Sequence, residues 1–149
     1  MFYNGYNNTD LAGSPSVKGV KYNSSGEGTA VTPTLVLNSD SMSVVCNAEG
    51  VEAGSGILYW SKAVDITDFN TLGLAAVNNS ASGTTGWIRL GVADAVPSSI
   101  TGWPCTNVAL SDYTGEMQFD LSNIAGMKYI IIGFHRGNQS WTIKRVELI

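Results

Sequence analysis

The side chains of this sequence that could do chemistry are aromatic and polar rather than nucleophilic. Flat aromatic faces pack against the C–H groups of sugar rings, and amide, guanidinium and imidazole groups nearby can bind the sugar hydroxyls. Several residues of both kinds stand in segments that we expect at or near the surface, so the pattern predicts a ligand site. Its candidate ligand-binding residues are Trp87, Arg89, Trp103, Tyr113, His135, Arg136 and Asn138.

Two of these residues should point the same way because they alternate with apolar residues along a strand. Ile88 separates Trp87 from Arg89, and Leu90 follows. Successive side chains of a strand point to opposite faces, so if Ile88 and Leu90 face the core, Trp87 and Arg89 face outward together. Trp103 lies in the loop sequence SSITGWPC, where a large aromatic residue has less reason to be in the core.

The single histidine gives little support to a nucleophilic enzyme. A Ser-His-Asp triad would need His135, and nothing near the many serines singles one of them out. His135 follows Ile132 and Phe134 near the end of a predicted strand. This position favours a histidine at the surface or the rim of the domain, with a ligand contact as the alternative.

Paired carboxylates could hydrolyse a glycosidic bond if they stood roughly 5–9 Å apart across a sugar. The pairs are Asp65 with Asp68, Glu49 with Glu52, and Asp112 with Glu116. We expect the first pair to cap a turn, because Asp side chains bond their own backbone two or three residues on. The second pair lies in a Gly-rich loop, where it should be solvated. The sequence therefore predicts a protein that is not an enzyme and has no catalytic residue.

No cofactor is expected from the residues that could bind one. Asp40 or Asp65, with loop carbonyls, could supply some of the oxygen ligands of a structural calcium ion. Neither Cys46 nor Cys105 has a metal-ligand partner at the short spacing of a zinc site. Two free thiols are favoured, with a Cys46–Cys105 disulfide open in an oxidising environment. Cys46 shares the predicted inner side of a strand with Met42, so we expect it in the core.

Charge is scarce in this chain. Asp, Glu, Lys and Arg make up 13% of its 149 residues, about half the roughly 25% of typical soluble domains. The net charge is −4 and the pI is about 4.7, which excludes the basic footprint of a protein that binds nucleic acid or an anionic membrane. A neutral surface rich in Asn, Ser, Thr and Gly suits a partner such as a sugar or a second copy of the chain.

Targeting signals are not recognisable either. The start, MFYNGYNNTD, has no basic region followed by an apolar one, so we expect no signal peptide. The longest strongly apolar run is Ile130–Ile132, far below the ~20 residues of a membrane span. We expect either a piece of a larger protein or a protein that leaves the cell by lysis or with an assembly.

The segments that must position these residues have strand patterns. Predicted strands are Ser16–Val20, Leu35–Leu37, Met42–Asn47, Ile57–Lys62, Leu72–Val77, Trp87–Ala93, Glu116–Leu121, Tyr129–Arg136 and Ser140–Leu148. The apolar residues change from one face of this last strand to the other between Ile143 and Val146, which indicates a bulge. The polar residues 135–139 between two strands indicate a hairpin. At most one short helix or 3₁₀ turn is expected, at Asp65–Phe69 or Ser122–Gly126.

Strands at this spacing, separated by long turns, predict an all-β fold. Apolar residues on alternate positions leave one face of each strand for a core, and no segment keeps a helical apolar period over three turns. We predict an antiparallel β-sandwich of the jelly-roll type. The expected division is a turn-rich N-terminal segment, 1–34, which could serve as an interface arm, and a sandwich domain, 35–149.

The order of several motifs resembles the jelly-roll domains of bacteriophage and prophage tail or receptor-binding proteins. These motifs are VDITDFNTL at Val64–Leu72, FDLS at Phe119–Ser122, GMKYIIIGF at Gly126–Phe134, and a last strand that ends at Val146–Leu148. Similar arrangements occur in carbohydrate-binding modules attached to glycoside hydrolases. The resemblance covers roughly residues 35–149.

This resemblance implies binding rather than catalysis. It implies a non-catalytic domain on a virion tail or another extracellular particle, a homo-oligomer with a trimer favoured, that recognises carbohydrate on a bacterial surface and does not insert into a membrane. Three alternatives stay open: a structural oligomerisation domain of such a particle, a carbohydrate-binding module of a glycoside hydrolase, and a small hydrolase with a carboxylate pair.

Overall fold

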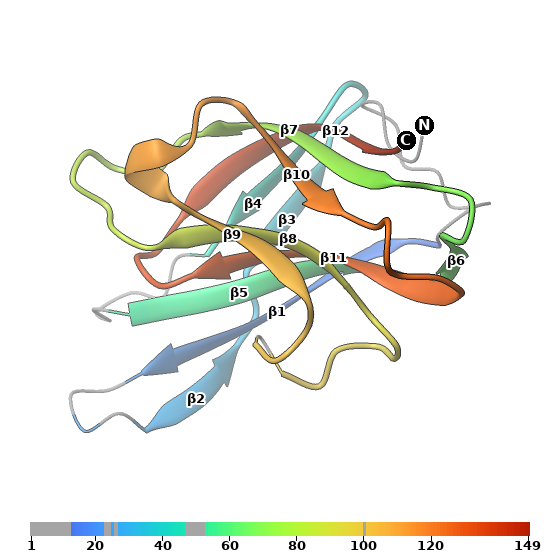
Figure 1. Ribbon diagram of the computed structural model, residues 1–149. Helices are drawn as coiled ribbons and strands as arrows, with labels where there is room; N and C mark the ends of the chain where they lie inside the picture. The colour runs from blue at the N-terminus through green and yellow to red at the C-terminus, as the bar shows by residue number, and fades with distance from the viewer. Residues whose placement is uncertain (1–12, 23–24, 26, 47–52, 100) are drawn as a thin grey trace.

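The computed structural model describes residues 13–22, 25, 27–46, 53–99 and 101–149. These residues form twelve strands and one 3₁₀ helix (Figure 1). In chain order the elements are β1 (Pro15–Tyr22), β2 (Gly28–Val31), β3 (Thr34–Leu37), β4 (Met42–Val45), β5 (Ala53–Trp60), β6 (Val64–Asp65), β7 (Thr71–Asn78), β8 (Trp87–Ala93), β9 (Cys105–Ala109), η1 (Leu110–Asp112), β10 (Glu116–Asp120), β11 (Met127–His135) and β12 (Ser140–Leu148).

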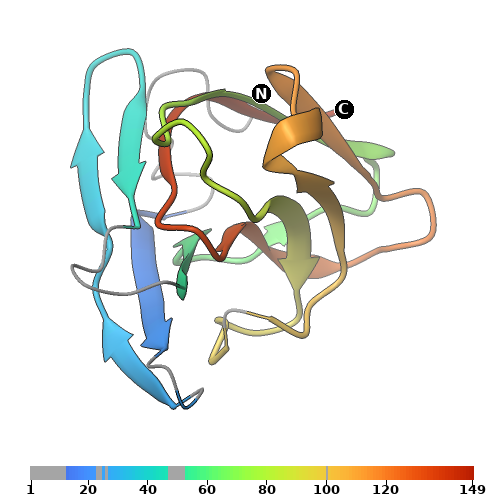
Figure 2. The ribbon, with the colours of Figure 1, turned by 90° about the vertical axis from the view of Figure 1, so that its left-hand side faces the viewer.

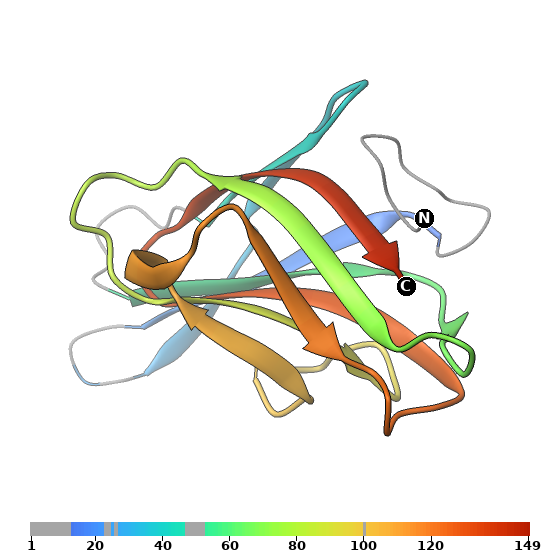
Figure 3. The same cartoon turned by 45° about the horizontal axis from the view of Figure 1, so that its top comes forward.

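The strands form two antiparallel sheets that pack face to face (Figure 3). One sheet has the order β2-β1-β5-β11-β8-β9, with β6 paired to β11, and the other has the order β10-β7-β12-β4-β3. From β4 onward the chain crosses repeatedly from one sheet to the other. As a result, the strands β4-β12-β7-β10 of one sheet lie over β5-β11-β8-β9 of the other. These are the two four-stranded sheets of a jelly roll. The predicted fold class is confirmed.

The core between the sheets follows from the alternation of apolar residues. Trp60 of β5 and Trp141 of β12 are each only 1% exposed, so both belong to the core. Ile88 and Leu90 are fully buried in the same core. Each such aliphatic side chain contributes about 1.5–3 kcal/mol through the apolar surface that it removes from water.

The predicted bulge is present, whereas the predicted hairpin is wrong. The pairing of β12 with β7 shifts its register between Ile143 and Arg145. However, β11 pairs with β5, β6 and β8, and β12 pairs with β4 and β7, so the two consecutive strands belong to different sheets. Residues 136–139 are therefore a crossover loop. Polar turn residues between two strands look the same in both cases, because the sequence does not say which strands pair.

The 3₁₀ helix lies outside both segments in which a helical turn was expected, because it follows β9 at Leu110–Asp112. Three paired strands, β2, β6 and β9, were not expected. β1 lies before residue 35 and is hydrogen-bonded to β5 along its whole length, from Pro15 opposite Trp60 to Tyr22 opposite Ala53. It therefore belongs to the same sheet as the strands that follow residue 35.

β2 is the edge strand of one sheet and β3 is the edge strand of the other. Both edges lie at the left of the molecule in Figure 2.

No helix of the described residues is long and apolar enough to cross a membrane.

Candidate functional site

The outer face of the six-stranded sheet carries a second apolar layer. Ile57 and Ile131 are fully buried, yet they do not belong to the core between the sheets. Above this face, the ring of Trp103 lies across Gly133, where an added Cβ would stand 3.0 Å from the ring atoms. The segment between β8 and β9 is tied down by Lys18, whose Nζ donates to the Pro97 carbonyl at 2.7 Å. Trp103 is thus partly buried, with packing as one of its roles.

Trp87 and Arg89 project from this same outer face, because Ile88 and Leu90 occupy the core. The centroid of the Trp87 ring lies 5.7 Å from that of His135, on the neighbouring strand β11, at an interplanar angle of 38°. The Arg136 guanidinium carbon lies 5.9 Å from the centroid of the Trp87 ring, a distance at which a cation is attracted to an aromatic face.

Arg89 extends the same group of side chains toward β9. Its Nε donates to Oδ1 of Asn107, directly opposite in the register, at 2.9 Å. Its backbone neighbour on the other side is Gly133, over which Trp103 packs. The structure therefore brings together five of the predicted residues on one face, and we call them the aromatic–cationic cluster: Trp87, Arg89, Trp103, His135 and Arg136.

Gln139 holds the backbone of this cluster in place. It is fully buried, and the two N–H groups of its Nε2 are shared among the carbonyls of Trp87 at 3.0 Å, His135 at 3.2 Å and Arg136 at 2.9 Å. Its Oε1 accepts a hydrogen bond of 2.8 Å from Nε1 of the core Trp141. One amide therefore links β8, the crossover loop and the core. No periodic or motif signal marks this residue in the sequence.

Two glycines let the crossover loop approach the loop before β8. Gly137 has φ +87°, and a Cβ there would overlap the carbonyl oxygen of Thr85. Gly86 has φ +125°, and a Cβ there would stand 2.5 Å from the His135 carbonyl oxygen. Only a residue without a Cβ meets both requirements at these positions.

Trp87 and Arg136 line an open groove of about 260 Å³ at this end of the sandwich. Its other lining residues are Thr84, Thr85, Gly86, Ala109, Leu110 and Ser111. A larger groove of about 410 Å³ lies between β1, β2 and the segment before β9. Its lining has no aromatic residue, and Lys18 there already binds Pro97 and lies 5.3 Å from the centre of the Tyr59 ring. The smaller groove is therefore the better candidate for a ligand site.

The electrostatics of the cluster are cationic. Burial, followed by the charges of Arg89 and Arg136, lowers the pKa of His135 below its usual value. Nδ1 of His135 and Nε1 of Trp103 are buried and have no hydrogen-bond partner among the described residues. Within that part of the chain, Arg89 and Arg136 form no ion pair, whereas Arg145 pairs with Glu116 and Glu147 on the other sheet.

Two of the predicted site residues, Tyr113 and Asn138, do not belong to the aromatic–cationic cluster. Tyr113 packs edge-on against Trp141, with ring centroids 4.9 Å apart. Its hydroxyl donates to the Ala76 carbonyl and accepts from the Ala76 N–H, both at 3.1 Å. Burial raises the pKa of Tyr113 to about 12. The structure does not bring Tyr113 to the aromatic–cationic cluster. Asn138, with φ +50°, belongs to the crossover loop beside Arg136, and its Oδ1 is buried.

The carboxylates that were considered for catalysis have local partners. Oδ1 of Asp65 accepts from the N–H of Thr67 at 3.1 Å and from its hydroxyl at 2.6 Å, so the predicted turn cap is confirmed for Asp65. These bonds lower the pKa of Asp65. Glu116 binds Arg145 instead of facing Asp112. The third pair, Glu49 with Glu52, lies outside the described residues.

The other titratable side chains of the described residues do not form a metal site. In the described ranges no three His, Cys, Asp or Glu side chains converge as metal ligands. Both cysteines are free, as favoured. Cys46 lies in the core as predicted, and burial raises the pKa of its thiol to about 12, which keeps it protonated and unreactive.

The fold and the cluster together define a jelly-roll sandwich with an aromatic–cationic groove at one end of one sheet. Comparison of the chain with protein-family models, with curated proteins and with solved structures finds no match.

Proposed function

We propose that this chain is a non-catalytic glycan-binding module, and that its site is the groove lined by Trp87 and Arg136. The observation that carries the proposal is a partly exposed indole beside an unpaired guanidinium, in an open groove with hydroxyl groups on its walls. An aromatic face and hydrogen-bonding groups that converge on one concave surface suit a sugar ring with its hydroxyls.

The binding chemistry follows from this arrangement. A sugar ring that enters the groove places its C–H groups on the indole of Trp87. The hydroxyls of Thr85 and Ser111 and the guanidinium of Arg136 then reach the sugar hydroxyls. Gln139 fixes the carbonyls around Trp87 and Arg136 before the ligand arrives, which lowers the entropy lost on binding.

The wider context of the module is part of the same proposal. The motifs at Val64–Leu72 and Gly126–Phe134 resemble those of phage and prophage tail jelly rolls. We place the chain on a virion tail or a similar extracellular particle, as a homotrimer that attaches to carbohydrate on a bacterial host. The low content of charged residues supports this context, because neutral polar surfaces suit contacts with sugars and with identical subunits.

A second function has its own supporting observation. The hairpin of β3 and β4 projects from the sandwich (Figure 3), and on it Val36 is 48% and Leu37 is 52% exposed. β3 is also an edge strand, whose free N–H and C=O groups can pair with another chain. A structural oligomerisation domain would use this edge.

The test of the glycan function is a glycan array read with the wild-type protein and with Trp87→Ala. We expect the variant to lose roughly fivefold or more in affinity, because stacking of a ring on an aromatic side chain is worth about 1–3 kcal/mol. The control is Tyr129→Ala, which removes a partly exposed aromatic from the same face at the opposite end of β11. Equal array signals from wild type and Trp87→Ala would reject the site.

A further inference from the structure

The six-stranded sheet is positively charged although the chain as a whole is acidic. The strands β2, β1, β5, β11, β8 and β9 contain no Asp or Glu, and the short strand β6, which pairs with β11, contributes the single acid Asp65. They contain the basic residues Lys18, Lys21, Arg89 and Lys128. The five strands of the other sheet contain the acidic residues Glu116, Asp120 and Glu147 as well as the basic Lys144 and Arg145.

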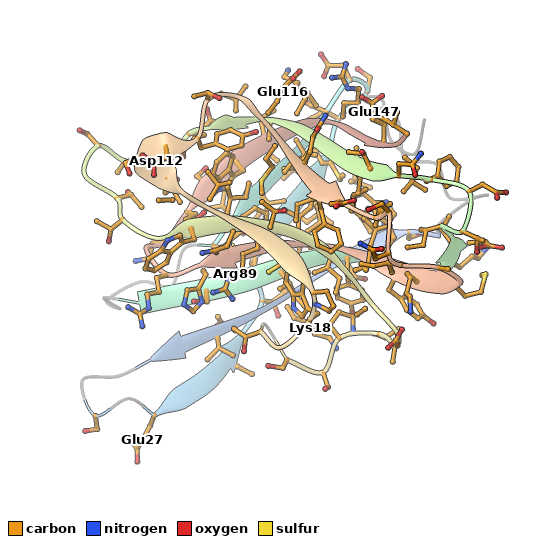
Figure 4. All side chains as sticks on the ribbon, viewed as in Figure 1. Lys18, Glu27, Arg89, Asp112, Glu116 and Glu147 are labelled. Carbon is orange, nitrogen blue, oxygen red and sulfur yellow. The ribbon has the colours of Figure 1, made fainter. Side chains whose placement is uncertain are left out.

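The same separation is visible in space. Figure 4 shows Arg89 and Lys18 on the side of the six-stranded sheet, with the acidic Glu27 at the distant tip beside β2, and Glu116 and Glu147 on the opposite side, over β7, β10 and β12. On the acidic side, Arg145 is neutralised by two glutamates, at 3.2 Å and 3.3 Å. Arg89 and Arg136 have no such partner among the described residues.

One unpaired arginine, Arg136, lines the proposed sugar site, and the other, Arg89, lies on the same sheet face beyond the groove lining. Arg136 stands over Trp87, and Arg89 lies two residues farther along the same face of β8. Only Nε of Arg89 is bonded within the described structure, to the neutral amide of Asn107. Its two terminal nitrogens therefore remain as donors. Both guanidinium charges act on His135, which lies between β8 and the crossover loop.

The nearby acidic residues do not offset the charges of the two arginines. Asp112, at η1, follows Ser111 of the groove wall and accepts a long hydrogen bond of 3.5 Å from the Ser111 hydroxyl. Figure 4 places Asp112 at the upper end of β9 and Arg89 below that strand. Asp94, the acid that follows β8, pairs with Lys128 at the far end of β11.

We propose that the glycan bound at Trp87 is acidic, with an oxyanion on the sugar held by Arg136 and Arg89. The inference rests on the proposed glycan function and narrows its substrate class. Guanidinium groups bind carboxylates and phosphates through two parallel hydrogen bonds, and a neutral sugar would leave both charges unpaired. The anion is the carboxylate of a uronic or sialic acid, or a phosphate ester on the sugar, because the two present the same paired oxygens.

The test uses glycans in matched pairs on the wild-type protein. Oligosaccharides that contain uronic or sialic acid are compared with their carboxyl-reduced forms, and sugar phosphates with their dephosphorylated forms. We expect the acidic member of one pair to bind at least roughly tenfold more tightly. That binding should weaken as NaCl is raised from 50 to 500 mM, while the binding of neutral forms changes little. Whichever pair shows the difference identifies the anion.

Substitutions of the two arginines test whether the preference for acidic glycans arises at the aromatic–cationic cluster. Arg136→Gln and Arg89→Gln should each lose roughly tenfold for the acidic glycan and little for its neutral form. Arg145→Gln, which removes an arginine from the other sheet, should leave both affinities unchanged. Circular dichroism and a thermal melt establish that each variant folds. If Arg89→Gln does not fold, Arg136→Gln decides, because no hydrogen bond of the Arg136 side chain is present in the described structure.

Two results overturn the inference, and they are distinguishable. If neutral and acidic forms bind equally, Trp87→Ala abolishes both and the Arg→Gln variants change neither, the module binds glycans that are not acidic. If no glycan binds, or if Trp87→Ala has no effect, the proposed glycan function fails and the inference fails with it.

Discussion

Gln139 connects the fold to the candidate site through a single side chain. Its amide makes four hydrogen bonds in a place with no water-exposed surface. Buried polar groups that are fully bonded specify one arrangement of their partners, because any other arrangement leaves bonds unmade. Trp87 and Arg136 therefore keep their relative position without contributing their own side chains to the restraint.

Replacing Gln139 by Leu should destabilise the protein and weaken glycan binding together. The change leaves the Trp141 indole N–H and several carbonyls buried without partners, at about 1–3 kcal/mol for each group. We expect a loss of about 3 kcal/mol in the free energy of unfolding, measured by urea denaturation. Gln118→Leu, at an exposed position of β10, should change it by less than about 0.5 kcal/mol. Equal losses in the two variants would contradict this role of Gln139.

At the scale of elements, the site depends on two loops that meet backbone to backbone. The crossover loop joins β11 of one sheet to β12 of the other, and the loop before β8 packs against it at Thr85 and Gly86. The groove is formed by this contact and by the start of η1. Any side chain inserted between the loops separates its two walls.

The substitution Gly137→Ala tests this contact. Gly137 has φ +87° and no room for a Cβ, whereas Gly83 has φ +81° with open space around it. Alanine at Gly83 should cost only the left-handed backbone strain of about 1–2 kcal/mol. Alanine at Gly137 adds a clash with Thr85, so we expect a loss of about 3 kcal/mol or more and weaker binding at Trp87. Urea denaturation and the glycan array measure the two effects. Similar stability of both variants would mean that the loops are not in close contact.

At the scale of the whole molecule, the two sheets differ in charge and in their free edges. The cationic face belongs to the sheet that contains β8 and β11, while the projecting β3–β4 hairpin belongs to the other. A module with this division can present a glycan site on one side and meet identical subunits on another. The proposed oligomer and the proposed ligand site therefore do not compete for the same surface.

The exposed hairpin allows a direct test of assembly. Leu37→Lys places a charge on the β3 edge, and charged edge residues oppose pairing between chains. We expect the wild type to sediment as an oligomer and Leu37→Lys as a monomer, with a change in stability within about 0.5 kcal/mol. Met127→Lys, at another exposed apolar position, should leave the oligomer intact. A wild-type monomer, or an oligomer that survives Leu37→Lys, would exclude this edge as the interface.

Local patterns predicted the parts of the structure that depend on neighbours in the sequence. The alternation around Ile88 shows that Trp87 and Arg89 share a face, and the parity shift after Ile143 marks the bulge, because both follow from the period of two along a strand. The sandwich itself was predictable as well, since strand patterns and turns repeat along the chain.

The tertiary structure decided what depends on pairing between distant segments. The sequence does not reveal that β11 and β12 lie in different sheets, that Gln139 is buried between them, or that Trp103 packs on Gly133. Tyr113 and Trp87 were both predicted to bind the ligand, yet one bonds the Ala76 backbone and the other faces a groove. By itself the sequence determined the class of fold and a surface poor in charge. Only the folding of the strands against one another gathered two unpaired arginines on one face, because that placement depends on strand order and register.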